Sequence, residues 1–354
     1  MHGNDIRPTP WGLTNGWPVK AARAFRPLLM AGAALLIAPQ LARADEGGAG
    51  FWLPGTYGSA AAEPGTPGWN IAISPYGASA DAGANVVRAR GIRIGDFDVT
   101  SHLQVSGRVQ TDSELVLLGV TYVFAKPILG GQASLGLGGE VGRTAAFQSA
   151  TVSVSVGPRQ AVRSFSVRDS VVGVGDFAPI VSLAWSAGPN SFMVYGTGNV
   201  PVGYDPHRLA NMGIGHGAVD GGAGYTFQNV SGDFEASAVA GFTYNLENPA
   251  THYRNGVDFH LDWATSHPLS KALNVGLVGY VYQQITGDGG AGDQVGPFMS
   301  RVVGIGPQVT YAFGLGELDA SLNLKGYAEL DASRRPAGYN IWLTLNLSPH
   351  ASEK

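Results

Sequence analysis

The last predicted strand, residues 339–347, alternates between two kinds of side chain. Its odd positions are apolar or aromatic, and its even positions are polar apart from Trp342. Because successive side chains of a strand point to opposite faces, the segment has one apolar face and one largely polar face. Its length matches the roughly 9–11 residues that a tilted strand needs to cross a bilayer. The pattern therefore indicates a strand with lipid on one side.

One such strand would also suit a soluble sandwich, but the same division recurs in residues 233–245, 257–263 and 318–330. In the last of these, leucine, alanine and glycine form one face, and the other consists of Asp319, Ser321, Asn323, Lys325, Tyr327 and Glu329. A shift of one residue would turn every charge outward, so the pattern also fixes the register. We therefore predict an all-β fold, an antiparallel transmembrane β-barrel whose last strand pairs with its first.

The number of strands follows from a scan of the whole chain. Candidate strands lie at residues 68–78, 101–110, 115–126, 131–141, 170–187, 191–200, 219–227, 233–245, 256–265, 272–285, 300–313, 317–330 and 339–347. Single-chain bacterial barrels have even strand numbers. The weakest candidate is 101–110, which favours about 12 strands, whereas a further strand at 151–156 would give 14. Short turns and longer connections, among them residues 142–169, roughly alternate, as they do in such barrels.

The chain begins with the features of a signal peptide. Arg23 and Arg26 precede an apolar run over residues 28–41, and an A-x-A cleavage pattern ends at Ala44. The apolar run is too short to span a bilayer as a helix. We expect residues 1–44 to be removed on export. Together with the predicted β-barrel, export places the mature chain in the outer membrane of a Gram-negative bacterium.

Composition excludes several other classes of protein. Charged residues make up 14% of the chain, against about 25% in soluble domains, and glycine reaches 52 of 354 residues. A lipid-facing band explains why so little charge is needed. The net charge of -4 gives no indication of nucleic-acid binding, and the lack of cysteine excludes disulfides and thiol chemistry. We predict neither a cofactor nor a metal.

Residues 45–67 precede the first predicted strand and are dense in glycine and proline, which prevent regular structure. They could form a disordered leader. A plug in the barrel mouth is the alternative, because large apolar side chains in a solvated tail would remain unburied. The plug candidates are Phe51, Trp52, Leu53 and Tyr57. The barrel itself is expected over residues 68–348, followed by a short tail over residues 349–354.

Several short motifs point to one family. They include Val200-Pro201-Val202-Gly203-Tyr204-Asp205, Gly241-Phe242-Thr243-Tyr244-Asn245, His260-Leu261-Asp262-Trp263, Gly276-Leu277-Val278-Gly279-Tyr280, Gly304-Ile305-Gly306-Pro307-Gln308 and, upstream, Phe51-Trp52-Leu53-Pro54-Gly55. In these motifs, which extend over nearly the whole mature chain, the protein resembles the outer-membrane proteins of the MetA-pathway of phenol degradation, also called SphA-like. The resemblance implies a β-barrel that passes hydrophobic or aromatic compounds inward, and it brings no catalytic residues. The chain departs from the usual barrel ending, because its last strand stops at Leu347 and a polar tail follows.

The face opposite the predicted lipid face supplies the candidate lining of the substrate pathway. Its members combine aromatic rings with amides and charges: Asp258, His260, Asp262, Tyr280, Tyr282, Gln284, Asn323, Lys325, Tyr327, Glu329 and Trp342. Rings offer stacking area and the polar groups offer hydrogen bonds, which suits the passage of an aromatic solute. The same rings could instead simply fill a narrow barrel.

Three charged clusters have alternative interpretations. The carboxylates of Asp258 and Asp262 flank His260 and could hold a divalent metal, but polar residues are expected on any lumen face. Residues 286–293 contain two carboxylates, too few oxygen ligands for a typical calcium loop. The arginines of residues 331–335 could contact lipopolysaccharide phosphate or belong to an ordinary turn.

The function that this sequence favours is an outer-membrane channel for passive uptake of small hydrophobic or aromatic compounds, and not an enzyme. A structural or adhesive barrel with a closed lumen is the main alternative. An outer-membrane lipid hydrolase would need a nucleophile beside a base, for which Ser237 and His260 are the nearest pair. The expected partners are outer-membrane lipid, lipopolysaccharide, the barrel assembly machinery and the small solute itself.

Overall fold

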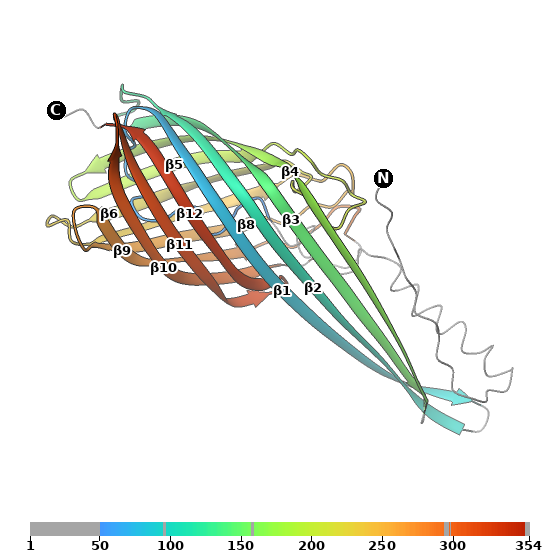
Figure 1. The fold of residues 1–354 in the computed structure, drawn as a ribbon. Coiled ribbons are helices and arrows are strands. Elements are labelled where there is room, and N and C mark those ends of the chain that lie inside the picture. Colours follow the sequence, from blue (N-terminus) through green and yellow to red (C-terminus); the bar gives the residue numbers. More distant parts are fainter. Residues whose placement is uncertain (1–49, 95–96, 157–158, 294–296, 298, 351–354) are drawn as a thin grey trace. The chain divides into compact units, whose positions relative to one another are not determined.

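The computed structural model describes residues 50–94, 97–156, 159–293, 297 and 299–350. Within these residues twelve strands form one closed barrel, in which each strand is antiparallel to both of its neighbours (Figure 1). No helix in this part of the chain is long and apolar enough to cross a membrane. The expected antiparallel barrel of 12 strands is confirmed. The expected signal peptide, residues 1–44, lies outside the described residues.

The strands follow chain order around the barrel, and β1 lies beside both β2 and β12. The first four strands are long: β1 (Gly68–Ile94), β2 (Phe97–Val123), β3 (Gln132–Val156) and β4 (Arg159–Ala187). The others are shorter: β5 (Asn190–Asn199), β6 (Ala218–Gln228), β7 (Glu235–Asn245), β8 (Asp258–Pro268), β9 (Leu273–Gln284), β10 (Arg301–Leu315), β11 (Leu318–Ser333) and β12 (Ala337–Pro349). One end of the barrel carries the short turns, such as residues 316–317, and the other end carries the long connections, such as residues 200–217.

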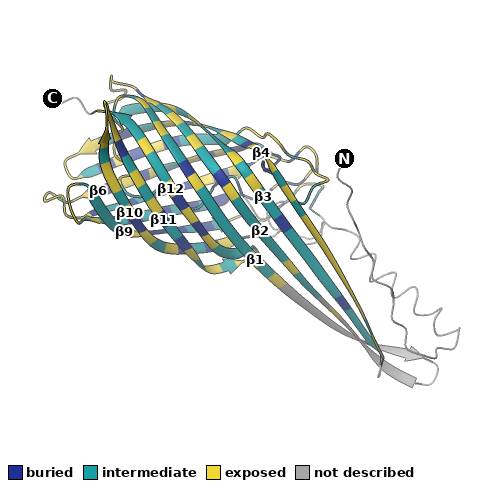
Figure 2. Cartoon of the chain, viewed as in Figure 1, coloured by how far each residue is buried: buried dark blue, intermediate teal, exposed yellow. Residues whose placement is uncertain are grey.

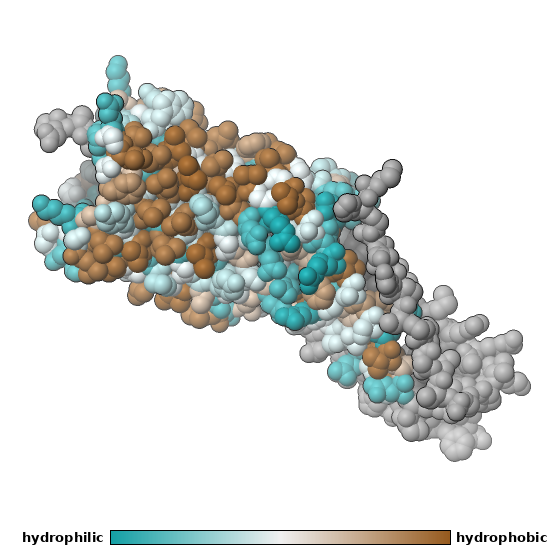
Figure 3. All heavy atoms as spheres, in the orientation of Figure 1, coloured by the Kyte–Doolittle hydropathy of each residue, from teal (hydrophilic) through white to brown (hydrophobic). Residues whose placement is uncertain are grey.

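The alternation in the sequence corresponds to two faces of the barrel wall. On β7 the side chains of Ser237, Val239 and Thr243 are buried, whereas Phe242 and Tyr244 are about half exposed. Figure 2 shows the same alternation along other strands. The exposed side chains form a broad apolar surface over the barrel wall (Figure 3). An apolar surface of this extent is the lipid-facing band of a transmembrane barrel.

The first four strands continue beyond the rest of the barrel (Figure 1). β1 pairs with β2 along its whole length, but its pairing with β12 ends at Asp81 and Ala337. β4 pairs with β3 as far as Arg159, but its pairing with β5 ends at Ile180. The described part of this four-stranded sheet beyond the level of Asp81 comprises residues 82–94, 97–109, 148–156 and 159–167, and we refer to it as the projection.

Two predictions from the sequence are wrong in this region. Residues 101–110 and 115–126 do not form two strands but lie almost wholly in the single strand β2. Residues 142–156 and 159–169 are not a long loop but parts of β3 and β4, so residues 151–156 add no fourteenth strand. The reason is that a strand needs an apolar outer face only where it meets lipid. Antiparallel pairing continues in water after the outer face has become polar.

Candidate functional site

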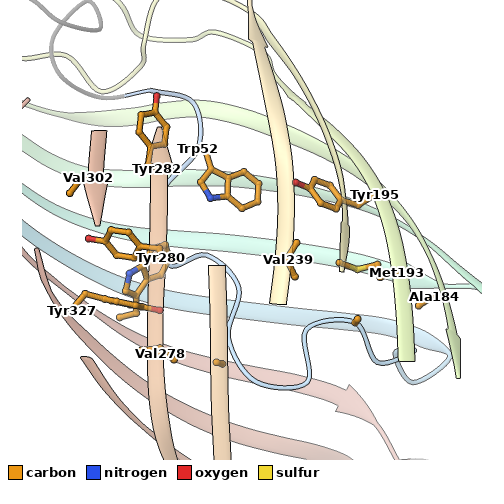
Figure 4. Close-up of a cluster of buried hydrophobic side chains, with 13 residues drawn as sticks. Trp52, Ala184, Met193, Tyr195, Val239, Val278, Tyr280, Tyr282, Val302 and Tyr327 are labelled. Carbon is orange, nitrogen blue, oxygen red and sulfur yellow. The ribbon is translucent and has the colours of Figure 1, made fainter. Parts of the chain in front are cut away.

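The N-terminal segment, residues 50–67, lies inside the barrel. Trp52 is only 6% exposed and Ala62 is fully buried, and both belong to the cluster of buried apolar side chains in the lumen. Figure 4 shows Trp52 between wall strands, with Tyr195 on one side and Tyr282 on the other. The interior of the barrel is therefore partly filled by chain that belongs to no strand.

Two charged side chains of the wall hold one turn of this segment. Asp262 on β8 accepts hydrogen bonds from the backbone N–H groups of Gly55, at 2.9 Å, and Tyr57, at 3.1 Å. Lys325 on β11 donates from its Nζ to the carbonyl oxygens of Gly55, at 2.7 Å, and Thr56, at 3.4 Å. Asp262 and Lys325 are both almost completely buried. Buried charges persist when polar groups satisfy them, and here backbone dipoles of the segment do so.

The later part of the segment has further polar contacts with the wall. The N–H group of Ala60 donates to Glu235 Oε1 at 2.9 Å, and that of Ala62 donates to Thr226 Oγ1 at 3.1 Å. Gln308 donates from Nε2 to the hydroxyl of Ser59 at 2.5 Å. Because strands β6, β7 and β10 provide these partners, the segment is attached to several sides of the lumen.

Aromatic contacts join the segment to the wall at a second level. The Trp52 ring stacks on the His260 ring, with 3.7 Å between the centroids and 12° between the planes. Tyr195 lies 6.1 Å from Trp52 and 5.8 Å from Tyr57, measured between ring centroids. His260 is in turn held by Asp220, whose Oδ2 lies 2.8 Å from Nε2 of His260. Packing of flat rings against one another makes this contact extensive without fixing it covalently.

A further group of rings lies on β9, β11 and β12. The rings of Tyr280 and Tyr327 are 4.9 Å apart, and Lys325 Nζ lies 5.2 Å from the centroid of Trp342. The Tyr280 hydroxyl donates to Glu329 Oε1 at 3.0 Å and accepts from Asn340 Nδ2 at 3.0 Å. The lumen wall therefore offers ring faces together with hydrogen-bonded polar groups such as the Tyr280 hydroxyl.

The structure places the predicted pathway residues as follows. Those that are buried on the inner face are Asp258, His260, Asp262, Tyr280, Tyr282, Gln284, Lys325, Tyr327 and Trp342, and Asn323 and Glu329 are half-buried there. Among the plug candidates Trp52 is buried, and Phe51, Leu53 and Tyr57 are half-buried. Gln284 lies at the base of the long connections, where it donates to Asp288 Oδ1 at 2.6 Å and accepts from the N–H group of Ser300 at 3.2 Å.

The carboxylates that flank His260 do not gather around a common point. Asp258 accepts a hydrogen bond from Asn245, and Asp262 holds the N-terminal segment. Among the described residues no three histidine or acidic side chains are grouped as metal ligands. In the predicted loop at residues 286–293, Asp288 accepts from the Tyr253 hydroxyl at 2.5 Å and so anchors the connection.

The Ser237 and His260 side chains are too far apart to act together. Ser237 pairs with Ala264 and His260 pairs with Gly241, so the two lie four residues apart along neighbouring strands. At about 3.3 Å per residue this is roughly 13 Å, well beyond hydrogen-bond reach. The Ser237 hydroxyl instead lies 2.7 Å from that of Thr226.

Tyr195 and Asp220 both contact His260, and neither is among the pathway residues predicted from the sequence. Their strands, β5 and β6, were predicted, but their two faces were not separated. On β5 the buried Met193 and Tyr195 lie two residues apart, with the exposed Val194 between them. The alternation that identified the other lumen residues would therefore have identified Tyr195 as well.

A polar cavity of about 520 Å³ lies at the short-turn end of the lumen, below the N-terminal segment. Ser59 and Glu63 of the segment line it from one side. The wall contributes Glu235, Asn323 and Lys325, together with several further serine, threonine and asparagine side chains. This end of the lumen is therefore suited to water and hydrogen-bonding groups.

At the opposite end, the connection between β5 and β6 is fastened to β4 by Asp169. Arg208 Nη2 donates to Asp169 Oδ1 at 2.7 Å, and the N–H groups of Leu209 and Ala210 each donate to Oδ2 at 3.2 Å. The bond from Arg208 lowers the pKa of the Asp169 carboxyl, and the same bond raises the pKa of Arg208. The ion pair is thus a local fastening of the loop at the base of the projection.

We expect protection of the Leu209 and Ala210 amides from hydrogen exchange to fall in acid. Because the pKa of Asp169 is lowered in the folded state, its contribution is complete above its ordinary pKa and is lost as the pH falls through the lowered value. Exchange protection factors across this pH range test the prediction, with Asp169→Asn as the control. Equal protection of these amides at acid and neutral pH, or equal protection in the wild type and Asp169→Asn, would contradict the prediction.

A closed antiparallel barrel with an apolar outer wall, a polar and aromatic lumen and long connections at one end is an outer-membrane β-barrel. The chain belongs to the MetA-pathway of phenol degradation family, whose profile matches residues 79–345. The family resemblance inferred from the sequence motifs is confirmed.

A solved outer-membrane channel shares the fold. The COG4313 outer membrane channel from Pseudomonas putida F1 is 13% identical, with a TM-score of 0.50 over 81% of this chain and 97% of that chain. A FadL homologue from Pseudomonas aeruginosa is 10% identical, with a TM-score of 0.35 over 78% of this chain and 89% of that chain. A search of curated proteins gives no match.

Proposed function

We propose that the chain is an outer-membrane channel for the passive uptake of small hydrophobic or aromatic compounds, with its N-terminal segment as a plug. The observation that carries the proposal is the way the lumen is filled. Trp52 and Tyr57 of the segment lie against Tyr195 and His260 of the wall, through ring contacts and not covalent bonds. An aromatic solute could make the same contacts after the segment moves aside.

Two findings from the comparisons support this proposal. The family is described by a pathway of phenol degradation, which fits an aromatic solute. The structure from Pseudomonas putida is described as an outer membrane channel and shares the barrel over most of both chains. We extend the function of that protein to this chain as part of the proposal.

The proposed route has an aromatic part and a polar part. Near the N-terminal segment, Tyr280, Tyr327 and Trp342 offer ring faces on which a solute can stack. Beyond the segment, the cavity of about 520 Å³ opens among serine, threonine and asparagine side chains at the short-turn end. Short turns face the periplasm in such barrels, so the solute would leave there.

Planar-bilayer conductance of the refolded mature chain, with and without phenol or toluene, tests the proposed function. We expect an open current that decreases when the solute occupies the lumen. Uptake of toluene into vesicles that contain the protein gives a second measurement. Folded protein that carries no current and adds nothing to toluene uptake would contradict the channel.

A structural barrel with a closed lumen is the second candidate function. It is favoured by the bonds from Asp262, Lys325 and Glu235 to the N-terminal segment, which attach the segment to three strands. A closed barrel and a plugged channel differ in what happens when these bonds are removed. When the bonds are removed, a plugged channel is expected to carry more ionic current, whereas a closed structural barrel is not.

We expect Asp262→Ala to loosen the plug without preventing folding. The change removes the acceptor for the Gly55 and Tyr57 amides and leaves Lys325 buried without its nearest opposite charge. More frequent openings in single-channel recordings are the expected result. Asp258→Ala is the matched control, because Asp258 lies on the same face of β8 but accepts from Asn245. Equal opening frequencies in the two variants would argue against a plug that is held in place by Asp262.

The proposal includes the route by which the chain reaches the membrane. Export would depend on a signal peptide cleaved near Ala44, and insertion would depend on the barrel assembly machinery. The mature wall would then contact outer-membrane lipid, and its outer connections would contact lipopolysaccharide. The mass of the protein purified from outer membranes tests the cleavage, since a chain that retains residues 1–44 would exclude it.

A further inference from the structure

The projection reverses the polarity of the barrel wall. On the outer face of the wall, apolar side chains such as Leu135, Leu137 and Val141 of β3 are 40–52% exposed. Further along β3 the same face carries Ser149, Thr151 and Ser153, and hydrogen bonds join the last two to Ser164 and Gln160 of β4. In Figure 3 the described part of the projection is mostly teal and white on its outer face. The projection therefore lies outside the lipid-facing band, in contact with water.

The inner face of the projection is largely apolar instead. It carries Val109 of β2, Ala150 and Val152 of β3, and Phe165 and Val167 of β4, with Gln148 between Val109 and Val167. Phe165 is 39% exposed and Val167 is 57% exposed. A sheet that stands in water does not need an apolar face. Exposed apolar patches usually mark places of binding.

A row of small residues lies at the centre of this inner face. Gly107, Ala150 and Phe165 are paired across β2, β3 and β4, so a row without large side chains ends at the Phe165 ring. A Cβ atom added at Gly107 would approach only the carbonyl oxygen of Ser149, at 3.7 Å. Val109 and Val152 stand on either side of the row, which leaves an open apolar floor bordered by a ring.

The inner face is continuous with the mouth of the barrel. Nearer the barrel on the same face, the Thr144 hydroxyl of β3 lies 3.7 Å from the sulfur of Met212, in the connection between β5 and β6. Arg208 of the same connection is bonded to Asp169 of β4. A molecule that moves along the inner face toward the barrel therefore meets this connection and then the lumen.

We propose that the inner face of the projection captures small apolar aromatic molecules and delivers them to the barrel mouth. The inference rests on the proposed function, because it names the place where uptake begins. The occupant is an aromatic solute because the face continues into an aromatic lumen and the row of small residues ends at the Phe165 ring. The Arg163 guanidinium, 4.8 Å from the Phe165 centroid, borders the same site with a cation that also favours ring faces.

Val162 and Val167 provide a matched pair of reporter positions. Both are valines of β4 with nearly equal exposure, 58% and 57%, but they lie on the outer and the inner face respectively. Because the chain has no cysteine, Val162→Cys or Val167→Cys can each be labelled with an environment-sensitive fluorophore at a single site. The full mature chain is reconstituted in vesicles and titrated with naphthalene.

We expect the fluorescence of the label at position 167 to change with naphthalene and that at position 162 to remain constant. Equal responses at both positions, or none at position 167, would overturn the inference. A signal at position 167 that depends on protein density in the vesicles and not on naphthalene would show that a second copy of the chain covers this face, which would also overturn it.

Uptake measurements separate this inference from the proposed function. At low naphthalene concentration, Val167→Asp should slow uptake several-fold, and Val162→Asp should match the wild type. If the wild type takes up naphthalene no faster than empty vesicles while the label at position 167 responds, the channel function fails and the capture surface stands. If the wild type transports naphthalene and Val167→Asp does so equally well, the capture surface is overturned and the channel stands.

Discussion

Deletion of residues 45–65 is expected to increase the ionic conductance of the reconstituted barrel strongly. The deletion removes Trp52 from the buried cluster. It also removes the backbone N–H groups that donate hydrogen bonds to Asp262 and Glu235, so the centre of the lumen is emptied. The strands themselves begin at Gly68, and their ladder does not include the deleted residues. The barrel should therefore still close. Its free energy of unfolding should fall somewhat, because the buried Lys325 loses its carbonyl partners.

Single-channel recording of the deletion variant and the intact mature chain measures this effect. Far-UV circular dichroism shows whether the variant retains its strand content. Trp52→Ala is a useful intermediate, because it removes the stacking on His260 but leaves the hydrogen bonds of the segment in place. Conductance that stays at the level of the intact chain in a correctly folded deletion variant would exclude the plug.

Leu324→Arg is expected to be strongly destabilising, and Asn323→Arg is expected to be mild. The Leu324 side chain is 48% exposed and pairs with Val309 and Leu343, which are also exposed and apolar. An arginine there faces lipid and costs about 2–4 kcal/mol near the bilayer midplane. Asn323 points into the lumen and lines the polar cavity, where an arginine remains hydrated.

The two variants differ by one position, so the comparison isolates the direction of the side chain. Urea unfolding in lipid vesicles gives the free energy of unfolding of each variant. Phe259→Asp tests a second outward-facing position, on β8, with a smaller cost expected for aspartate than for arginine. Equal losses of stability at positions 323 and 324 would show that the assignment of the two faces is wrong.

The lipid-facing and lumen-facing sides were predictable because the requirement is local. A strand in a bilayer must present apolar side chains to lipid at every second position, whatever its neighbours are. The faces of residues 318–330 and 339–347 follow from this rule alone. The same rule gave the strand number, once residues 101–110 were set aside as the weakest segment.

The lengths of β1 to β4 were not predictable in this way. Outside the bilayer the outer face no longer needs to be apolar, and the polar residues 111–114 resemble a turn when they are read alone. Only pairing with β1 and β3 shows that β2 continues through them. The inner apolar face of the projection becomes recognisable after that pairing is known.

The sequence by itself determined that this protein is an antiparallel barrel and which face of its clearly alternating strands meets lipid, and it left open whether the aromatic residues near the N-terminus are buried. The tertiary structure decided what buries them. Asp262 and Lys325 are ordinary lumen residues in the sequence, and their hydrogen bonds to Gly55 join positions more than 200 residues apart. The physical reason is that alternation along a strand fixes the direction of a side chain, whereas its partner depends on how the closed barrel brings distant strands and the N-terminal segment together.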